Sequence, residues 1–242
     1  MNQIDIELEW NKLMGYINTY ISAPRKDLLI SLYEKMAERV CTAPASSTKP
    51  LHGCYAGGYI VHVNNVIACA IKQYELWSSS GVPTATFTLE ELVFAAINHD
   101  LGKCGSIEEP YYIPHDSDWH VSKGMVYKSN PALNFIMVPD RSILLLQQHG
   151  VQFSENEFLA IRLHDGIYTD ANKPYYMAGI DNKFKTPIVE ILHHADVLAT
   201  RVEEYNQLRR HSIPTDEYPF VDTVSTSIPA VTEFDNAFKA FM

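Results

Sequence analysis

Apolar side chains recur at intervals of three and four residues along most of the chain, which is the spacing of an amphipathic helix. Thr88 followed by Glu91 has the composition of an N-terminal capping box, and Gly150 and Gly166 occupy positions typical of C-terminal caps. The pattern predicts an all-α chain. The predicted helices cover residues 6–21, 27–41, 57–77, 88–99, 140–150, 154–166 and 186–210.

The segments between these helices have the composition of loops. Residues 42–50 ("TAPASSTKP") are rich in Pro, Ser and Thr, and residues 102–139 are rich in prolines and aromatics, which predicts a long ordered loop with at most one short helix. A second loop is predicted over residues 167–185. Beyond residue 211 the chain is proline-bearing and predicted to be extended, with a short terminal helix left open. No internal repeat and no domain boundary is visible, so residues 1–242 are interpreted as one domain.

Composition narrows the class of protein. The 242 residues are 46% hydrophobic and 20% charged, an ordinary globular balance, and the formal net charge is -10. An acidic chain is unsuited to wrapping long nucleic acid, which requires a basic surface. The N-terminal "MNQIDIELEW" lacks a signal-like apolar core, and no apolar run reaches the ~20 residues of a membrane span. The four cysteines form no CxxC pair, so we expect reduced thiols and a cytoplasmic protein, with no membrane partner.

Four side chains stand where a helical pattern expects apolar residues. His62 lies in "YIVHVNNVI", His99 and Asp100 end the "VFAAI" helix, and Asp196 lies in "ILHHADVLA". Buried charge is costly unless it is paired or metal-bound, and one divalent cation would satisfy all four groups. The donor set suits Mn, Fe, Co, Ni, Zn or Mg. Taken singly, His62 also fits a packed core histidine, and Asp196 an ion pair with Arg201 or Lys185.

The strings "GGYIVHV", "AAINHDLGK" and "EILHHADVLATRVE" resemble the HD superfamily of metal-dependent phosphohydrolases. That family's H…HD…D signature matches His62, His99, Asp100 and Asp196, and the likeness covers about residues 51–201. It implies an all-α HD-domain helical bundle with long ordered loops. The HD core would span about residues 51–205, preceded by N-terminal helices (1–42) and followed by a C-terminal extension (211–242). The nearest resemblance is to the HD domain of bacterial 3′–5′ exoribonucleases and to small phage-encoded HD proteins; a phage-encoded protein would lie in the host cytoplasm.

The resemblance implies roles for the residues around the cation. Asp100 would take a proton from the attacking water, and His164 would orient the water or protonate the leaving oxygen. Lys103 would contact the phosphate or pair with the Asp, with a solvated surface lysine as the alternative. His164 and His120 are candidates for a second metal site. "IRLHDGIY" occupies the place of the exonucleases' His-His-Gly segment, but Asp165 stands where their second histidine lies, which argues against a complete dinuclear centre. His115 and His149 are interpreted as structural or exposed. The candidate substrate contacts are Lys103, His193, Arg201 and Lys123.

The expected activity is hydrolysis of a phosphate ester or anhydride of a nucleotide or deoxynucleotide by a metal-activated water. Tyrosines in the two long loops, such as Tyr168, would stack a base, or would only anchor those loops by aromatic packing. Two alternatives remain: a 3′–5′ exonuclease on short single-stranded RNA or DNA, and a non-catalytic nucleotide-binding regulator. The expected partner is a small phosphorylated substrate, and a homo-oligomer is left open.

Overall fold

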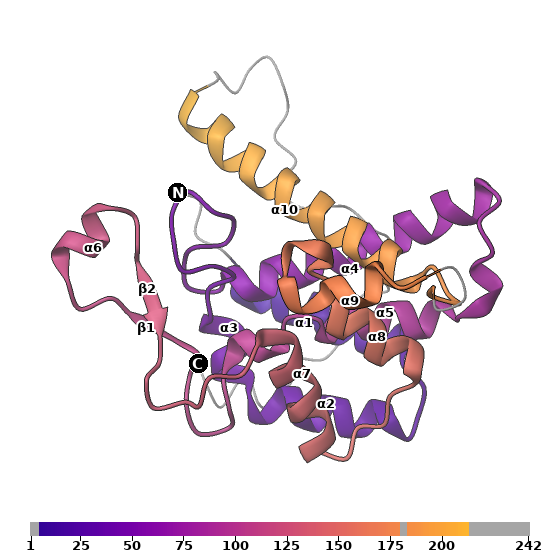
Figure 1. The fold of residues 1–242 in the computed structure, drawn as a ribbon. Coiled ribbons are helices and arrows are strands. Elements are labelled where there is room, and N and C mark those ends of the chain that lie inside the picture. The colour runs from indigo at the N-terminus through magenta and orange to yellow at the C-terminus, as the bar shows by residue number, and fades with distance from the viewer. Residues whose placement is uncertain (1–4, 180–182, 213–242) are drawn as a thin grey trace.

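The computed structural model describes residues 5–179 and 183–212, and helices dominate it (Figure 1). Helices contain 63% of the described residues and strands 4%, so the predicted all-α bundle is confirmed. The predicted C-terminal extension with its short terminal helix lies outside the described residues. The helices are α1 (Ile6–Tyr20), α2 (Arg25–Lys35), α3 (Ala37–Thr42), α4 (Gly58–Ser79), α5 (Leu89–Asn98), α6 (Asp118–Ser122), α7 (Val138–Gln148), α8 (Glu155–Leu163), α9 (Lys173–Tyr176) and α10 (Ile188–Ser212). Single 3-10 turns are η1 (Thr84–Thr86), η2 (Leu101–Cys104), η3 (Gly166–Tyr168) and η4 (Asp170–Asn172).

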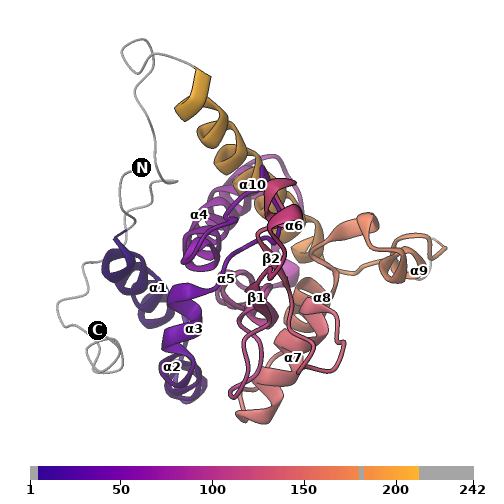
Figure 2. The same cartoon turned by 90° about the vertical axis from the view of Figure 1, so that its left-hand side faces the viewer.

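Helix α5 is the centre of the bundle. Residues 92–98 of this helix are all buried, as expected for a helix that is apolar on every side. It contacts α1 and α4 on one side and α8 and α10 on the other, an arrangement visible in Figure 2. Its first turn carries the predicted capping box, with the Thr88 side chain accepting from the Glu91 backbone N–H and the Glu91 carboxylate accepting from the Thr88 N–H. Because α5 is central and capped, the side chains at its C-terminal end are held in a fixed position.

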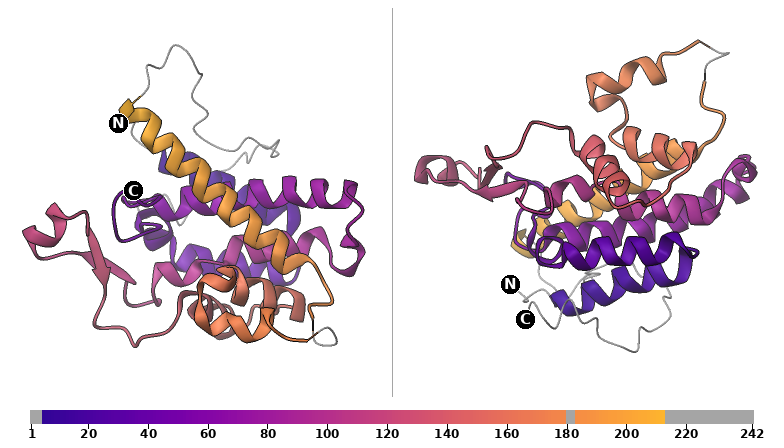
Figure 3. Two further views of the ribbon diagram at one scale, coloured as in Figure 1. Left: turned by 45° about the horizontal axis from the view of Figure 1, so that its top comes forward. Right: turned by 90° about the horizontal axis from the view of Figure 1, so that it is seen from below.

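The two longest described helices, α4 and α10, cross over one another beside α5 (Figures 1 and 3). Helix α4 begins at Gly58, directly after Gly57, whose φ of +82° suits glycine because other side chains are strained there. Gly58 also has no room for a side chain, since a Cβ would stand 2.0 Å from the Gly53 carbonyl oxygen. The crossing places the apolar faces of both helices, and the few polar residues within those faces, against each other.

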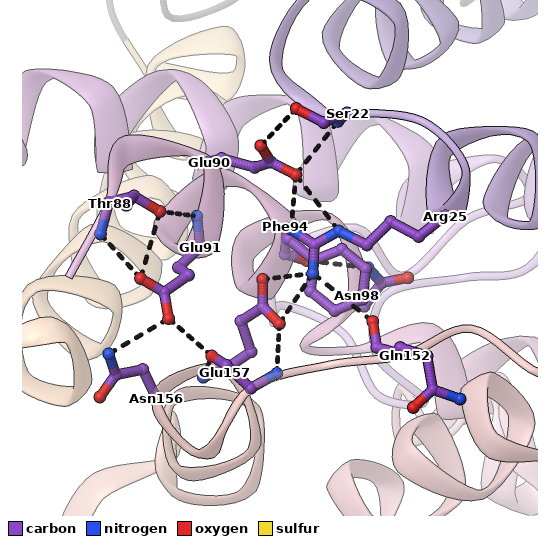
Figure 4. Close-up of polar contacts among 11 residues, drawn as sticks. Ser22, Arg25, Thr88, Glu90, Glu91, Phe94, Asn98, Gln152, Asn156 and Glu157 are labelled. Carbon is purple, nitrogen blue, oxygen red and sulfur yellow. Dashed lines mark hydrogen bonds and ion pairs between the residues drawn. The ribbon is translucent and has the colours of Figure 1, made fainter.

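An ion-pair network ties the N-terminal helices to the bundle (Figure 4). Arg25, at the start of α2, donates to Glu90 of α5 at 2.7 Å and to both carboxylate oxygens of Glu157 of α8 at 2.7 and 2.9 Å. Its guanidinium also lies 4.4 Å from the centre of the Phe94 ring. The Glu157 side chain is fully buried, so Arg25 supplies the charge that makes this burial tolerable.

The helix predicted over residues 27–41 is two helices, because the chain bends at Met36. The Met36 backbone has φ −103° and ψ 9°, and it joins α2 to α3. Leu32, Met36 and Val40 are all buried, so the apolar face continues across the bend. Apolar periodicity alone could not reveal the break, since neither Gly nor Pro marks it.

The loop predicted over residues 102–139 contains more structure than expected. Strands β1 (Tyr112–Pro114) and β2 (Tyr127–Ser129) pair antiparallel with Ile113 opposite Lys128, and the short α6 connects them. This hairpin-like excursion projects from the helical body in Figures 1 and 3. It is tied to the segment before α4 by a bridge between Thr48 and Met125. Strands of three residues are too short to show an alternating pattern in the sequence.

Two further expectations concern membranes and thiols. None of the helices in the described ranges combines the length with the apolar character that a bilayer crossing requires. Cys41, Cys54, Cys69 and Cys104 are all buried free thiols.

Candidate metal centre

The four predicted ligands converge in the structure. His62 comes from α4, His99 and Asp100 from the end of α5, and Asp196 from α10. His62 Nε2 lies 3.2 Å from Asp196 Oδ1 and 3.7 Å from Asp100 Oδ2, and His99 Nε2 lies 3.4 Å from Asp100 Oδ2. Ligand atoms about 2.1 Å from one shared ion are separated from each other by about 3.0–3.5 Å. The ligand atoms form two overlapping groups, His62 with His99 and Asp100, and His99 with His164 and Asp196, each within 4.8 Å, and this spacing suits the binding of a small cation in the cluster.

The end of α5 turns two adjacent side chains toward one point. His99 still has helical backbone angles, whereas Asp100 leaves the helix with φ −111° and begins the 3-10 turn η2. Gly102 allows this turn to lie against α7, because a Cβ there would stand 2.2 Å from the Val138 carbonyl oxygen. The Gly102 N–H donates to Ser142 Oγ, which in turn donates to the His99 carbonyl. The glycine of "HDLGK" thus permits close packing, and α7 holds the turn in place.

The imidazoles present Nε2 to the cluster because Nδ1 is committed elsewhere. His99 Nδ1 lies 2.8 Å from the Ala96 carbonyl oxygen, and His164 Nδ1 lies 2.8 Å from that of Ile161. A carbonyl only accepts, so Nδ1 carries the proton in both rings and Nε2 is left with a lone pair when the ring is neutral. His99 Nε2 is buried and makes no hydrogen bond within the described ranges, although Asp100 Oδ2 is 3.4 Å away. A buried nitrogen that has a lone pair and no hydrogen-bond partner is able to bind a metal ion.

The His62 ring lies between two carboxylates. Asp196 faces its Nε2, and both oxygens of Glu203 lie 3.3 Å from its Nδ1. Burial alone would lower the pKa of His62, but Glu203 and Asp196 outweigh it and raise that pKa to about 10. Burial would raise the pKa of Asp196, which His62 instead holds well below its usual range. The site therefore has a strong preference for positive charge.

Lys103 belongs to the same cluster. Its Nζ lies 2.6 Å from Asp100 Oδ2, and 16% of its side chain is exposed. Burial opposes both charges, yet the pKa of Asp100 is lowered well below its normal value by Lys103 and His99. The pKa of Lys103 is raised in turn, chiefly by Asp100 against the effect of burial. An ammonium ion therefore stands beside a prospective metal ligand.

His164 joins the cluster from the C-terminal end of α8. Its Nε2 lies 3.6 Å from Asp100 Oδ1 and 3.5 Å from Asp165 Oδ1, and its ring meets that of His99 edge-on at 4.8 Å. Burial would lower the pKa of His164, but Asp165 and Asp100 raise it to about 9. Its ligand atom also groups with those of His99 and Asp196 within 4.8 Å. The structure thus places His164 beside the four predicted ligands.

His193 contacts the backbone of the segment that carries His164. Its Nδ1 lies 2.7 Å from the His164 carbonyl oxygen. The ring packs on Gly166, where a Cβ would stand 2.6 Å from His193 Cε1, and the φ of Gly166 is +62°. His193 therefore holds the end of α8 through the backbone; no contact of its side chain with the cluster appears among the described interactions.

Three predicted residues are not brought to the cluster. Arg201 is a surface residue of α10, its side chain 63% exposed and paired with Glu204 at 2.6 Å. Lys123 is exposed at the end of α6, on the excursion that projects from the body. His120 lies on α6 as well, where its ring stacks on that of His115 at 4.0 Å. Within the described ranges, His120 is in no group of possible ligands that close within 4.8 Å.

Two residues near the site escaped the sequence interpretation. Glu203 follows Asp196 by seven residues, two turns along α10, a spacing that could have signalled a shared face. His52 lies before α4, with its ring 4.6 Å from that of His62 and its Nε2 buried without a hydrogen bond to any described residue. Burial, together with His62 and Lys103, lowers the pKa of His52 to about 4. His52 stands in an irregular loop, where periodicity gives no signal.

Comparison with protein-family models, with curated proteins and with solved structures finds no match to the chain.

Proposed function

We propose that the protein is a metal-dependent phosphohydrolase of the HD type that acts on a nucleotide or a similar small phosphate ester or anhydride. The observation that carries this proposal is the buried Nε2 of His99, which has no hydrogen bond within the described residues and faces the Asp100 carboxylate. Leaving a buried polar atom without a partner costs about 1–3 kcal/mol. A bound cation would remove this cost and would also offset the negative charge of Asp100 and Asp196.

His62, His99, Asp100 and Asp196 would hold the cation, with His164 beside them. When bound, a divalent cation supplies a nucleophile by lowering the pKa of water and neutralises charge on a phosphoryl oxygen. Lys103, 2.6 Å from Asp100, would meet the oxygens of the incoming phosphate. His164, buried between Asp100 and Asp165, would orient the attacking water. Asp100 would accept the proton of the attacking water.

Access to the cluster supports a small substrate. His62 and His99 are buried, whereas 18% of the Asp196 side chain and 16% of that of Lys103 are exposed, so a phosphate would enter beside these two residues. Tyr168 is 83% exposed and its ring lies 6.1 Å from that of His193, directly after the segment that carries His164. An exposed ring in this position offers a surface on which a base would stack. The net charge of -10 disfavours a long polyanion.

The test is a substrate screen with a matched pair of variants. Nucleoside mono- and triphosphates, cyclic nucleotides and short single-stranded oligonucleotides are each incubated with the protein and Mn, Fe, Co, Ni, Zn or Mg, and phosphate or nucleoside release is measured. We expect cation-dependent release that a chelator abolishes and that Asp196→Asn lowers by at least about 100-fold, as expected when a cation-bound nucleophile is lost. Asp170→Asn is the control, because Asp170 is a 90% exposed acid whose ion pair among the described residues is with Lys173.

The outcome also separates the alternatives. Turnover of oligonucleotides alone, with steep salt dependence, would indicate an exonuclease. Nucleotide and cation binding without turnover of any substrate would indicate a regulator. Activity that persists in chelator, or in Asp196→Asn at the wild-type rate, would contradict the proposal.

A further inference from the structure

Helix α10 holds the His62 ring with two carboxylates, and the mechanism proposed above uses only one of them. Asp196 and Glu203 are seven residues apart, which is about two helical turns, so they lie on the same face of α10. Asp196 Oδ1 lies 3.2 Å from His62 Nε2, and both Glu203 oxygens lie 3.3 Å from His62 Nδ1. Each ring nitrogen of His62 therefore has its own carboxylate.

Glu203 cannot share a cation with the other ligands through this geometry. The two nitrogens of an imidazole point away from opposite edges of the ring, and Asp100 and Asp196 both face Nε2 of His62. Glu203 lies on the Nδ1 side. Its contribution to the cation must therefore pass through the His62 ring.

Glu203 is itself held in place. Only 11% of its side chain is exposed, and Asn65 Nδ2 donates to Glu203 Oε1 at 2.8 Å. Asn65 follows His62 by three residues on α4, so the histidine and the amide face α10 together. The Asn65 amide leaves the second oxygen of Glu203 available to His62.

We propose that Glu203 is the positioning residue of the metal centre: it accepts the Nδ1–H of His62 and so keeps the Nε2 lone pair directed at the cation. The inference rests on the proposed function, since it assigns a role within the same site. A carboxylate behind a ligating histidine fixes the tautomer, restrains the ring and increases the donor strength of the opposite nitrogen. His99 and His164 receive the same tautomer from backbone carbonyls, so His62 alone of the three depends on a side chain.

A competing use of these atoms is a second cation between Glu203, His62 and His52. The three residues each offer a ligand atom, all within 4.8 Å of one another. A neutral imidazole has only one lone pair, so His62 could serve this second ion through Nδ1 only by giving up the cluster on its Nε2 side. That cluster offers more ligands, which favours the positioning role. His52 distinguishes the two uses, because only the second ion requires it.

The experiment measures Co²⁺ binding to the full chain by titration calorimetry, with Glu203→Ala, Glu203→Gln and the neighbouring Glu204→Gln as the matched control. Glu204 pairs with Arg201, and the Glu204→Gln substitution removes one negative charge from the same turn of α10 as the Glu203 substitutions do. We expect one ion per chain, an affinity about 10–100-fold lower in Glu203→Ala, and the wild-type value in Glu204→Gln. Glu203→Gln should recover part of the loss, because its amide oxygen still accepts from Nδ1–H. Far-UV circular dichroism confirms that each variant is folded.

A second readout reports on His62 directly. Nitrogen-15 shifts of the histidines in the Zn²⁺-loaded protein should place the His62 proton on Nδ1, and Glu203→Ala should broaden or shift that signal while sparing those of His99 and His164. Unchanged Co²⁺ affinity in Glu203→Ala would overturn the inference while leaving the metal centre intact. Two ions per chain, one of them lost in His52→Ala, would overturn it in favour of the second site. Absence of any Co²⁺ binding to the wild type would instead contradict the proposed function.

Discussion

Cation binding to the cluster should release protons, and the number can be worked out from two histidines. The pKa of His62 is about 10 and that of His164 about 9, both raised by neighbouring carboxylates against the effect of burial. At pH 7 each ring is therefore more than about nine-tenths protonated before the cation binds. His62 must be neutral to act as a ligand, and His164 loses its proton because the cation cancels the field of the carboxylates. We expect about two protons to leave per ion bound.

The sign of the pH dependence follows from the same groups. Protons compete with the cation below the pKa values of the two rings, so the affinity should increase with pH, by roughly a hundredfold per pH unit between pH 6 and pH 8 if two protons leave. Titration calorimetry in buffers that share a pH but differ in ionisation enthalpy gives the number of protons as a slope. His164→Gln should reduce that number to about one. A slope near zero, with an affinity that does not change between pH 6 and pH 8, would show that His62 and His164 do not lose protons when the cation binds.

Three further predictions test individual contacts. Arg25→Ala leaves the fully buried Glu157 without its positively charged partner and should lower the free energy of unfolding by about 3–5 kcal/mol in urea titrations. An equal loss in a Glu157→Gln background would show that this ion pair is not the cause. Gly166→Ala places a methyl group 2.6 Å from the His193 ring at a left-handed position, so we expect about 1–3 kcal/mol of destabilisation, and an unchanged melting temperature would contradict this. Lys103→Met should lower turnover at least about tenfold while cation binding persists, whereas wild-type turnover would remove Lys103 from the phosphate site.

Much of the helical framework could be predicted from apolar spacing and capping residues. Helix α5 begins at the capping box of Thr88 and Glu91, and α8 begins at a capping box of the same kind. Both helices end at a His-Asp pair. The bend at Met36 was not predictable, because the buried face continues through it. The short strands around α6 were missed because three-residue strands carry too few positions for a pattern.

The convergence of the site was predictable only in part. His62, His99, Asp100 and Asp196 stood out because each is polar within an apolar helix segment, whereas Lys103 and His164 were assigned roles from the family resemblance. Arg201 lies near Asp196 in the sequence. Helical spacing nevertheless turns its side chain to the exposed side of α10, away from the site. Glu203 lies in the charged-looking stretch "RVEEYNQ", where a buried acid cannot be told from a solvated one without knowing that α4 covers it.

The most direct test of the proposed metal centre is a crystal of the protein soaked in Mn²⁺ and measured at a wavelength where manganese scatters anomalously. We expect one strong anomalous peak within about 2.0–2.3 Å of His62 Nε2, His99 Nε2, and an oxygen each of Asp100 and Asp196. The same crystal of Asp196→Asn should lose the peak or show it weakened. A fully occupied ion bound elsewhere, with His99 Nε2 still without a partner, would contradict the account.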